Sequence, residues 1–140
     1  MTLEIILIII SIILSAFFSS SEAAFLSIQK TKLFHMVNLK QKGADKVAKL
    51  LENKDKIIST IVVGNNIVNI AFAALLSSLI YKITESATLT TLLTTIIGTI
   101  ILMIFGEVIP KAIAVRMSEK LSIIYAKPLR ILEIIFHSFS

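Results

Sequence analysis

The stretch Phe105-Gly106-Glu107-Val108-Ile109-Pro110-Lys111 closes a long apolar run. It places a carboxylate and a proline inside a segment apolar enough to span a bilayer, where a charged side chain is costly and tends to be functional. Because Pro110 has no N–H, it cannot bond the carbonyl of Gly106, four residues earlier. A carboxylate beside a free carbonyl is the beginning of a site for a hard cation. The alternative is a simple proline kink, with Glu107 either snorkelling to the surface or paired with Lys111.

Composition places the chain among membrane proteins. Its 140 residues are 56% apolar and 16% charged, whereas soluble domains are about half apolar and about a quarter charged. The length allows one small helical bundle. The chain has no cysteine, which excludes disulfides and thiolate metal sites. We expect no enzyme, because the sequence lacks a nucleophile–base pair, a nucleotide-binding loop and metal-hydrolase spacing.

Three apolar segments predict three membrane-spanning helices, at about residues 3–28, 57–80 and 89–110. The segments 29–56 and 114–140 are basic and carry apolar residues at helical spacing, which is typical of amphipathic helices on a membrane surface. We expect Gly43 to separate two short helices in the first of these segments and Pro128 to divide the second. A solvated helical hairpin is the alternative for residues 29–56. The predicted fold class is an all-α membrane protein with three transmembrane helices and cytoplasmic-side amphipathic juxtamembrane helices.

The distribution of positive charge predicts the orientation of these helices. Lysines and arginines number none before the first span, eight between the first and second, one between the second and third, and five after the third. By the positive-inside rule, the N-terminus lies outside, and the Lys-rich segment and the C-terminus are cytoplasmic. The net charge of +5 therefore faces a membrane surface, and we expect membrane lipid rather than nucleic acid as a partner.

Polar residues interrupt all three spans at a similar predicted depth. Residues 19–22 lie late in the first span, Asn65 and Asn69 early in the second, and residues 106–110 at the end of the third. Asn65 and Asn69 are four residues apart and share one helix face, whereas Asn66 points elsewhere. The available ligands are all oxygens, which favours Mg²⁺, Ca²⁺, Mn²⁺ or Na⁺ over zinc or copper. The alternative for each residue taken separately is helix–helix hydrogen bonding, with Glu22 paired to Lys111.

Three motifs together resemble a known family of membrane proteins. They are Ser15-Ala16-Phe17-Phe18-Ser19-Ser20-Ser21-Glu22-Ala23-Ala24, Val63-Gly64-Asn65-Asn66-Ile67-Val68-Asn69 and Phe105-Gly106-Glu107-Val108-Ile109-Pro110-Lys111. In this order on successive spans, the motifs are similar to the signatures of the CorC/CNNM (cyclin M) magnesium transporters. The resemblance covers nearly the whole chain. The resemblance implies that residues 1–140 form a homodimeric transmembrane domain of the plasma membrane with a belt of juxtamembrane helices. Family members usually continue into cytoplasmic CBS domains that bind ATP–Mg²⁺; we expect none in this chain, as in an excised membrane domain or a natural short form.

The resemblance also implies a function and a set of ligands. Family members export Mg²⁺, with Na⁺ coupling proposed, and the ion would be held by Ser19 or Ser21, Asn65, Asn69, Glu107 and the Gly106 carbonyl. Glu22, Pro110 and Lys111 would have structural or gating roles. Ser20 stands where the family often has glycine, which leaves open which hydroxyl faces the ion. The alternative function is a non-transporting membrane module, either a magnesium sensor or a regulatory scaffold that holds a structural cation.

Overall fold

Helices account for nearly all of the computed structural model, which describes residues 2–28, 30–40 and 42–138. The helices are α1 Thr2–Ser27, α2 Lys30–Asn38, α3 Ala44–Leu51, α4 Lys54–Thr84, α5 Ala87–Ile101, the π-helix η1 Leu102–Val108, α6 Ile109–Arg116 and α7 Ser118–Ser138. Residues 29, 41, 139 and 140 of the expected juxtamembrane segments lie outside the described residues. The predicted all-α fold class is confirmed.

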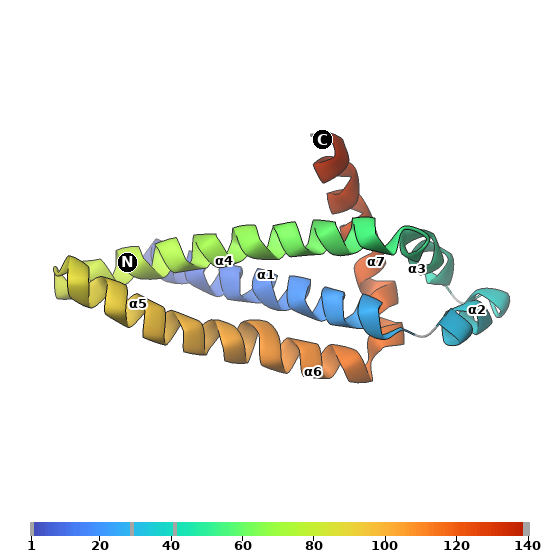
Figure 1. Cartoon of the computed structure of the whole chain (residues 1–140), viewed down its shortest axis with the longest axis horizontal. Helices are drawn as coiled ribbons and strands as arrows, with labels where there is room; N and C mark the ends of the chain where they lie inside the picture. Colours follow the sequence, from blue (N-terminus) through green and yellow to red (C-terminus); the bar gives the residue numbers. More distant parts are fainter. Residues whose placement is uncertain (1, 29, 41, 139–140) are drawn as a thin grey trace.

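Three helices are long and apolar enough to cross a membrane, as predicted: Thr2–Ser27, Lys54–Thr84 and Ala87–Arg116. They run side by side, with α5, η1 and α6 forming one continuous third rod (Figure 1). Helix α1 is the central element, because it contacts α4, η1, α6 and α7. The outward faces carry exposed apolar side chains such as Ile9, Ile70 and Ile96, as expected for helices surrounded by lipid.

The connection between the second and third spans is shorter than the predicted spans 57–80 and 89–110 indicated. Helix α4 continues through Thr84, because the stretch 81–86 contains neither glycine nor proline to end it. The turn is made by Glu85, whose φ of 54° is left-handed and whose N–H donates to the Tyr81 carbonyl at 2.9 Å. Ser86 then caps α5 by accepting a hydrogen bond from the Leu89 N–H at 3.3 Å.

The prediction that Pro128 divides the last segment is wrong. Helix α7 is continuous from Ser118 to Ser138 with Pro128 inside it. A proline within a helix frees one carbonyl, here that of Ile124. Both residues are exposed, so this carbonyl can bond to water or lipid headgroups. Helix α7 crosses the end of the bundle and does not run along it (Figure 1).

Gly43 separates α2 from α3, as predicted. Its φ of 87° is left-handed, a conformation that glycine adopts without penalty. A Cβ atom at this position would lie 2.7 Å from the Cγ2 of Ile123 on α7. The glycine therefore permits both the turn and the close packing of the α2–α3 hairpin against α7.

Apolar packing is concentrated at two levels of the bundle. Where α1, α3, α4 and α7 meet, the core includes Phe18, Phe25, Val47, Ile61 and Leu129. Toward the opposite end, a second cluster joins α1 to α4 through Ile8, Phe72, Leu76 and Ile80. The segments of α1 and α4 between these clusters carry buried polar groups, so the two apolar layers enclose a polar one.

Candidate metal centre

The polar layer is built on a contact between α1 and α4. The Ser15 hydroxyl donates to Oδ1 of Asn69 at 2.9 Å and lies 3.4 Å from Oδ1 of Asn65. Ser15 is fully buried, and the two asparagines are half-buried, one helical turn apart on the same face of α4. The shared face predicted from their spacing is confirmed, while Asn66 is exposed and lies outside the group.

Three side-chain oxygens converge in this cluster. Ser15 has one hydroxyl proton, so at any moment it can donate to only one of the two amide oxygens that approach it. The hydroxyl oxygen and both Oδ1 atoms therefore lie together with a single hydroxyl hydrogen between them. A hard cation is the species that would satisfy several such oxygens at once.

The third span meets this cluster through Gly106. Gly106 is buried in η1, and a Cβ atom there would lie 2.9 Å from the Ser15 Oγ. The absence of a side chain thus lets the backbone of the third span approach α1 closely. Ser15, Asn65, Asn69 and Gly106 come from three different helices and form one group.

The helix around Gly106 is a π-helix, whereas the alternative interpretation of the sequence was a simple proline kink. The Ile109 N–H bonds to the Ile104 carbonyl, five residues earlier, so the Phe105 carbonyl loses its α-helical donor. The Gly106 carbonyl loses its own donor because Pro110, which is buried at the start of α6, has no N–H. Two consecutive carbonyls therefore lack their usual α-helical partners beside the cluster. Single π-helical turns of this kind occur frequently at functional sites.

The first-helix serines differ in how their hydroxyls are used. Ser19 is fully buried, one turn after Ser15, and its Oγ has no hydrogen-bond partner in the described part of the chain. The Ser21 hydroxyl donates back to the Phe17 carbonyl at 2.6 Å. Ser20 lies 3.1 Å from the Tyr125 hydroxyl of α7. Of the two serines predicted as ligands, Ser19 forms no hydrogen bond in the described residues, whereas Ser21 uses its hydroxyl proton on its own helix.

The charged residues of the motifs remain unpaired. Glu22, Glu107 and Lys111 are each half-buried, and no ion pair joins any two of them within residues 2–28, 30–40 and 42–138. The alternatives that paired Lys111 with Glu107 or with Glu22 are therefore not supported. Glu107 directly follows Gly106 in η1, so its backbone is adjacent to the cluster. Among the described residues, no three Asp, Glu or His side chains gather as a metal site, and the cluster consists of neutral oxygens with one carboxylate next to it.

Sequence reasoning missed Ser15 as a member of the site. Ser11, Ser15 and Ser19 recur every four residues and are all buried on α1, so they lie on one face of the helix. That spacing was a usable signal. The role of Tyr125 had no sequence signal, because its contact with Ser20 joins residues 105 positions apart.

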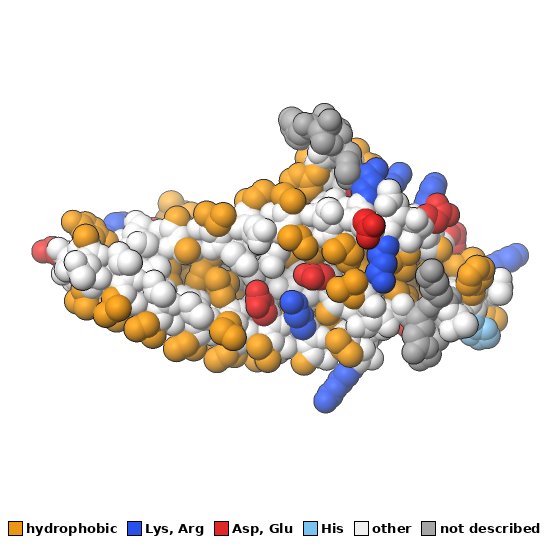
Figure 2. Space-filling view, in the orientation of Figure 1, with side chains coloured by type: hydrophobic (Ala, Val, Ile, Leu, Met, Phe, Trp, Pro, Cys, Tyr) orange, Lys and Arg blue, Asp and Glu red, His pale blue; other side chains and the backbone are white. Residues whose placement is uncertain are grey.

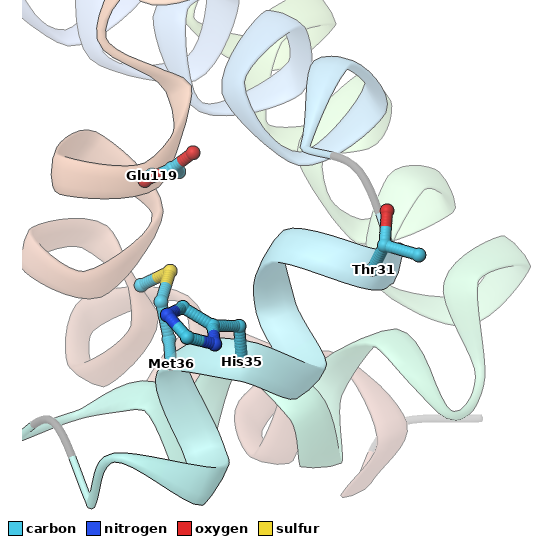
Figure 3. A pocket seen from close by; sticks show the side chains of 4 residues that line it. All are labelled: Thr31, His35, Met36 and Glu119. Atoms are coloured by element: carbon cyan, nitrogen blue, oxygen red, sulfur yellow. The ribbon is translucent and has the colours of Figure 1, made fainter.

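Two hollows lie on the surface away from this cluster, at the end of the molecule that holds α2, α3 and α7. The smaller one, of about 370 Å³, lies between α2 and α7 and is lined by Thr31, His35, Met36 and Glu119 (Figure 3). The larger one, of about 830 Å³, lies at the junction of α6 and α7. Figure 2 shows that most of the visible lysine and arginine side chains gather at this same end.

A three-span bundle with a buried oxygen cluster between two apolar layers defines the chain as an integral membrane domain with a candidate cation site. The family model for the cyclin M transmembrane N-terminal domain matches residues 6–140. The chain therefore belongs to the cyclin M transmembrane domain family, as the motifs predicted.

Related proteins from several bacteria agree with this membership. The chain is 35% identical over 117 residues to a UPF0053 protein of Haemophilus influenzae, covering 84% of this chain and 27% of that protein. It is 35% identical over 109 residues to the UPF0053 inner membrane protein YfjD of Escherichia coli, covering 78% and 25%. It is 30% identical over 135 residues to a UPF0053 protein of Synechocystis, covering 96% and 38%. The chain thus spans between about a quarter and two fifths of the length of these relatives.

Proposed function

We propose that the domain moves Mg²⁺ across the membrane through the cluster formed by α1, α4 and η1. The observation that carries this proposal is the convergence of the Ser15 hydroxyl on two amide oxygens, at 2.9 and 3.4 Å, beside the side-chain-free backbone of Gly106. About 20 Å of helix separates Thr2 from Ser15, which places the cluster well inside a hydrocarbon core of about 30 Å. Cation sites near mid-membrane on interrupted helices are the common arrangement in transporters.

The proposed ligand set consists of the oxygens that converge between α1, α4 and η1. Ser15, Asn65 and Asn69 would supply side-chain oxygens, and Gly106 a backbone carbonyl. Ser19 is preferred over Ser21 as the additional hydroxyl, because its buried Oγ lies one turn after Ser15 and has no hydrogen-bond partner in the described residues. Glu107 would add the negative charge that neutral oxygens cannot provide. Glu22, Pro110 and Lys111 would act structurally or in gating, with Pro110 holding the Gly106 carbonyl free.

We further propose an oligomeric state, a membrane orientation and a transport reaction for the domain. Residues 1–140 would form one transmembrane domain that works as a homodimer in the cell membrane, with the N-terminus outside and the Lys-rich segment inside. Export of Mg²⁺ coupled to Na⁺ entry is the proposed reaction. The support for the orientation is the charge distribution along the chain, and the support for a homodimer is the resemblance of the three motifs to the family.

A second candidate function is a membrane magnesium sensor or regulatory scaffold without transport. The contact that favours it is the one between Ser20 on α1 and Tyr125 on α7, at 3.1 Å, reinforced by the edge-on packing of Tyr125 against Phe17 at 4.9 Å between ring centres. Through this contact, a conformational change in the polar stretch of α1 would be transmitted to α7, which lies outside the bundle.

Flux measurements decide between the two functions. Wild-type protein in liposomes is expected to transport Mg²⁺, faster with an opposing Na⁺ gradient, and Glu107→Ala is expected to lower the rate at least tenfold, because the site loses its carboxylate. Glu52→Ala, which removes an exposed carboxylate at the end of α3, is the matched control and should transport normally. Wild-type protein that binds Mg²⁺ without flux would favour the sensor, and equal flux in Glu107→Ala would contradict the site.

A further inference from the structure

The groove of about 830 Å³ at the junction of α6 and α7 gathers unpaired positive charge. Lys42 from the α2–α3 loop, Arg116 from the end of α6 and Lys120 from the start of α7 all line it. Each is exposed, and none has an ion pair or a hydrogen bond in the described part of the chain. By contrast Lys56, Lys82 and Arg130 are each paired with a glutamate. The groove also contains one carboxylate, Glu119.

The groove lies at the boundary between the apolar spans and the polar end of the molecule. Ser27, the last residue of the first candidate span, and Arg116, the last residue of the third, both line it. Its remaining lining is mostly apolar and includes Val115 and Ile124, which are 57% and 53% exposed. One hollow therefore combines cations with an open apolar rim at the level of the membrane surface.

We propose that this groove binds the phosphate headgroup of an anionic phospholipid from the leaflet that α7 contacts. The three cations would bind the phosphate oxygens, and the hydroxyl of Ser118 is available as a further donor. Val115 and Ile124 would lie against the first methylenes of the acyl chains. Basic pockets between transmembrane helices are a known way of holding anionic headgroups, and a soluble anion would gain nothing from the apolar rim.

The bound lipid would bridge three parts of the domain. Arg116 ends the rod that contains Gly106, Lys120 begins α7, and Lys42 belongs to the α2–α3 hairpin. A headgroup that contacts all three would hold the inner end of the third span against the juxtamembrane helices. This role is independent of which ion the polar cluster binds.

The test uses phosphatidylglycerol added to the whole chain in a neutral detergent, with phosphatidylcholine as the reference lipid. Native mass spectrometry counts retained lipid, and thermal unfolding reports its effect on stability. Each cation near an anionic surface raises the binding affinity by a factor of about five. The triple variant Lys42→Gln/Arg116→Gln/Lys120→Gln is therefore expected to weaken phosphatidylglycerol retention by at least about tenfold. Phosphatidylcholine retention should not change.

The matched control removes the same charge elsewhere. Lys46→Gln/Lys49→Gln/Lys54→Gln changes three exposed lysines on α3 and the start of α4, outside the groove, and should retain phosphatidylglycerol as wild type does. Equal losses in both triple variants would mean non-specific attraction and would overturn the proposal. Full displacement of the lipid by millimolar inorganic phosphate would also overturn it, in favour of a soluble anion. All the substituted side chains are exposed, and unchanged helical circular dichroism would confirm folding.

Discussion

Asn69→Ala is expected to abolish the stabilisation of the domain by Mg²⁺ while leaving the fold intact. Asn69 accepts the 2.9 Å hydrogen bond from Ser15 and is half-buried, so truncation removes one proposed ion ligand and leaves little cavity. A ligand at about a hundred times its dissociation constant stabilises the folded state by about 2.7 kcal/mol. Thermal unfolding of wild type in rising Mg²⁺ should show that increment, and Asn69→Ala should show almost none of it.

Asn66→Ala is the matched control for this experiment. Asn66 lies on the same helix and has the same chemistry, but it is exposed and outside the cluster. It should keep the full Mg²⁺ response. Ser15→Ala should behave like Asn69→Ala, since Ser15 lies between both asparagines and Gly106. A normal Mg²⁺ response in both Asn69→Ala and Ser15→Ala would show that the ion binds elsewhere.

The sequence was sufficient for the features that depend on local pattern. Hydropathy located three spans, and the spacing of Asn65 and Asn69 placed them on one face, because helical periodicity alone determines both. Pro110 correctly marked an irregular helix. Its form, a π-helix in place of a kink, depends on how η1 packs against α1 and could not be derived from the proline itself.

The errors came from groups whose role depends on tertiary contacts. Pro128 was expected to end a helix, but its exposure lets the freed carbonyl be solvated, and exposure is not visible in the local sequence. The alternative that paired Lys111 with Glu107 or Glu22 is not supported, because helical spacing permits such a pair and does not require it. Ser15 was overlooked because its importance comes from residues 50 and 54 positions away.

Gly64→Ala is expected to separate α1 from α4 next to the candidate cation site. A Cβ atom at Gly64 would lie 2.6 Å from both Cε1 and Cζ of Phe18, whereas carbon atoms pack best at about 3.5–4.0 Å. Phe18 is buried and packs edge-on against Phe17, with 5.2 Å between ring centres. Because the rigid ring is packed in the buried apolar cluster, we expect the helices to shift, and Asn65 is the next residue along α4.

The matched control for Gly64→Ala is Gly98→Ala. Comparing the free energies of unfolding of the two variants separates the effect of overpacking from the effect of helix propensity. Both changes favour the helix by up to about 1 kcal/mol, but the added Cβ at Gly98 would lie 3.2 Å from Cδ2 of Leu76, the end of a side chain that can rotate. Gly98→Ala should therefore be neutral or slightly stabilising, while Gly64→Ala should lose about 1–3 kcal/mol through overpacking. Reversible unfolding in detergent measures both, and Mg²⁺ titration should show weaker binding only for Gly64→Ala. If the cause is the contact with Phe18, Phe18→Leu in the Gly64→Ala background should restore part of the stability. If Gly64→Ala alone is as stable as wild type, α1 does not pack closely on α4, and this packing cannot be what holds the two asparagines beside Ser15.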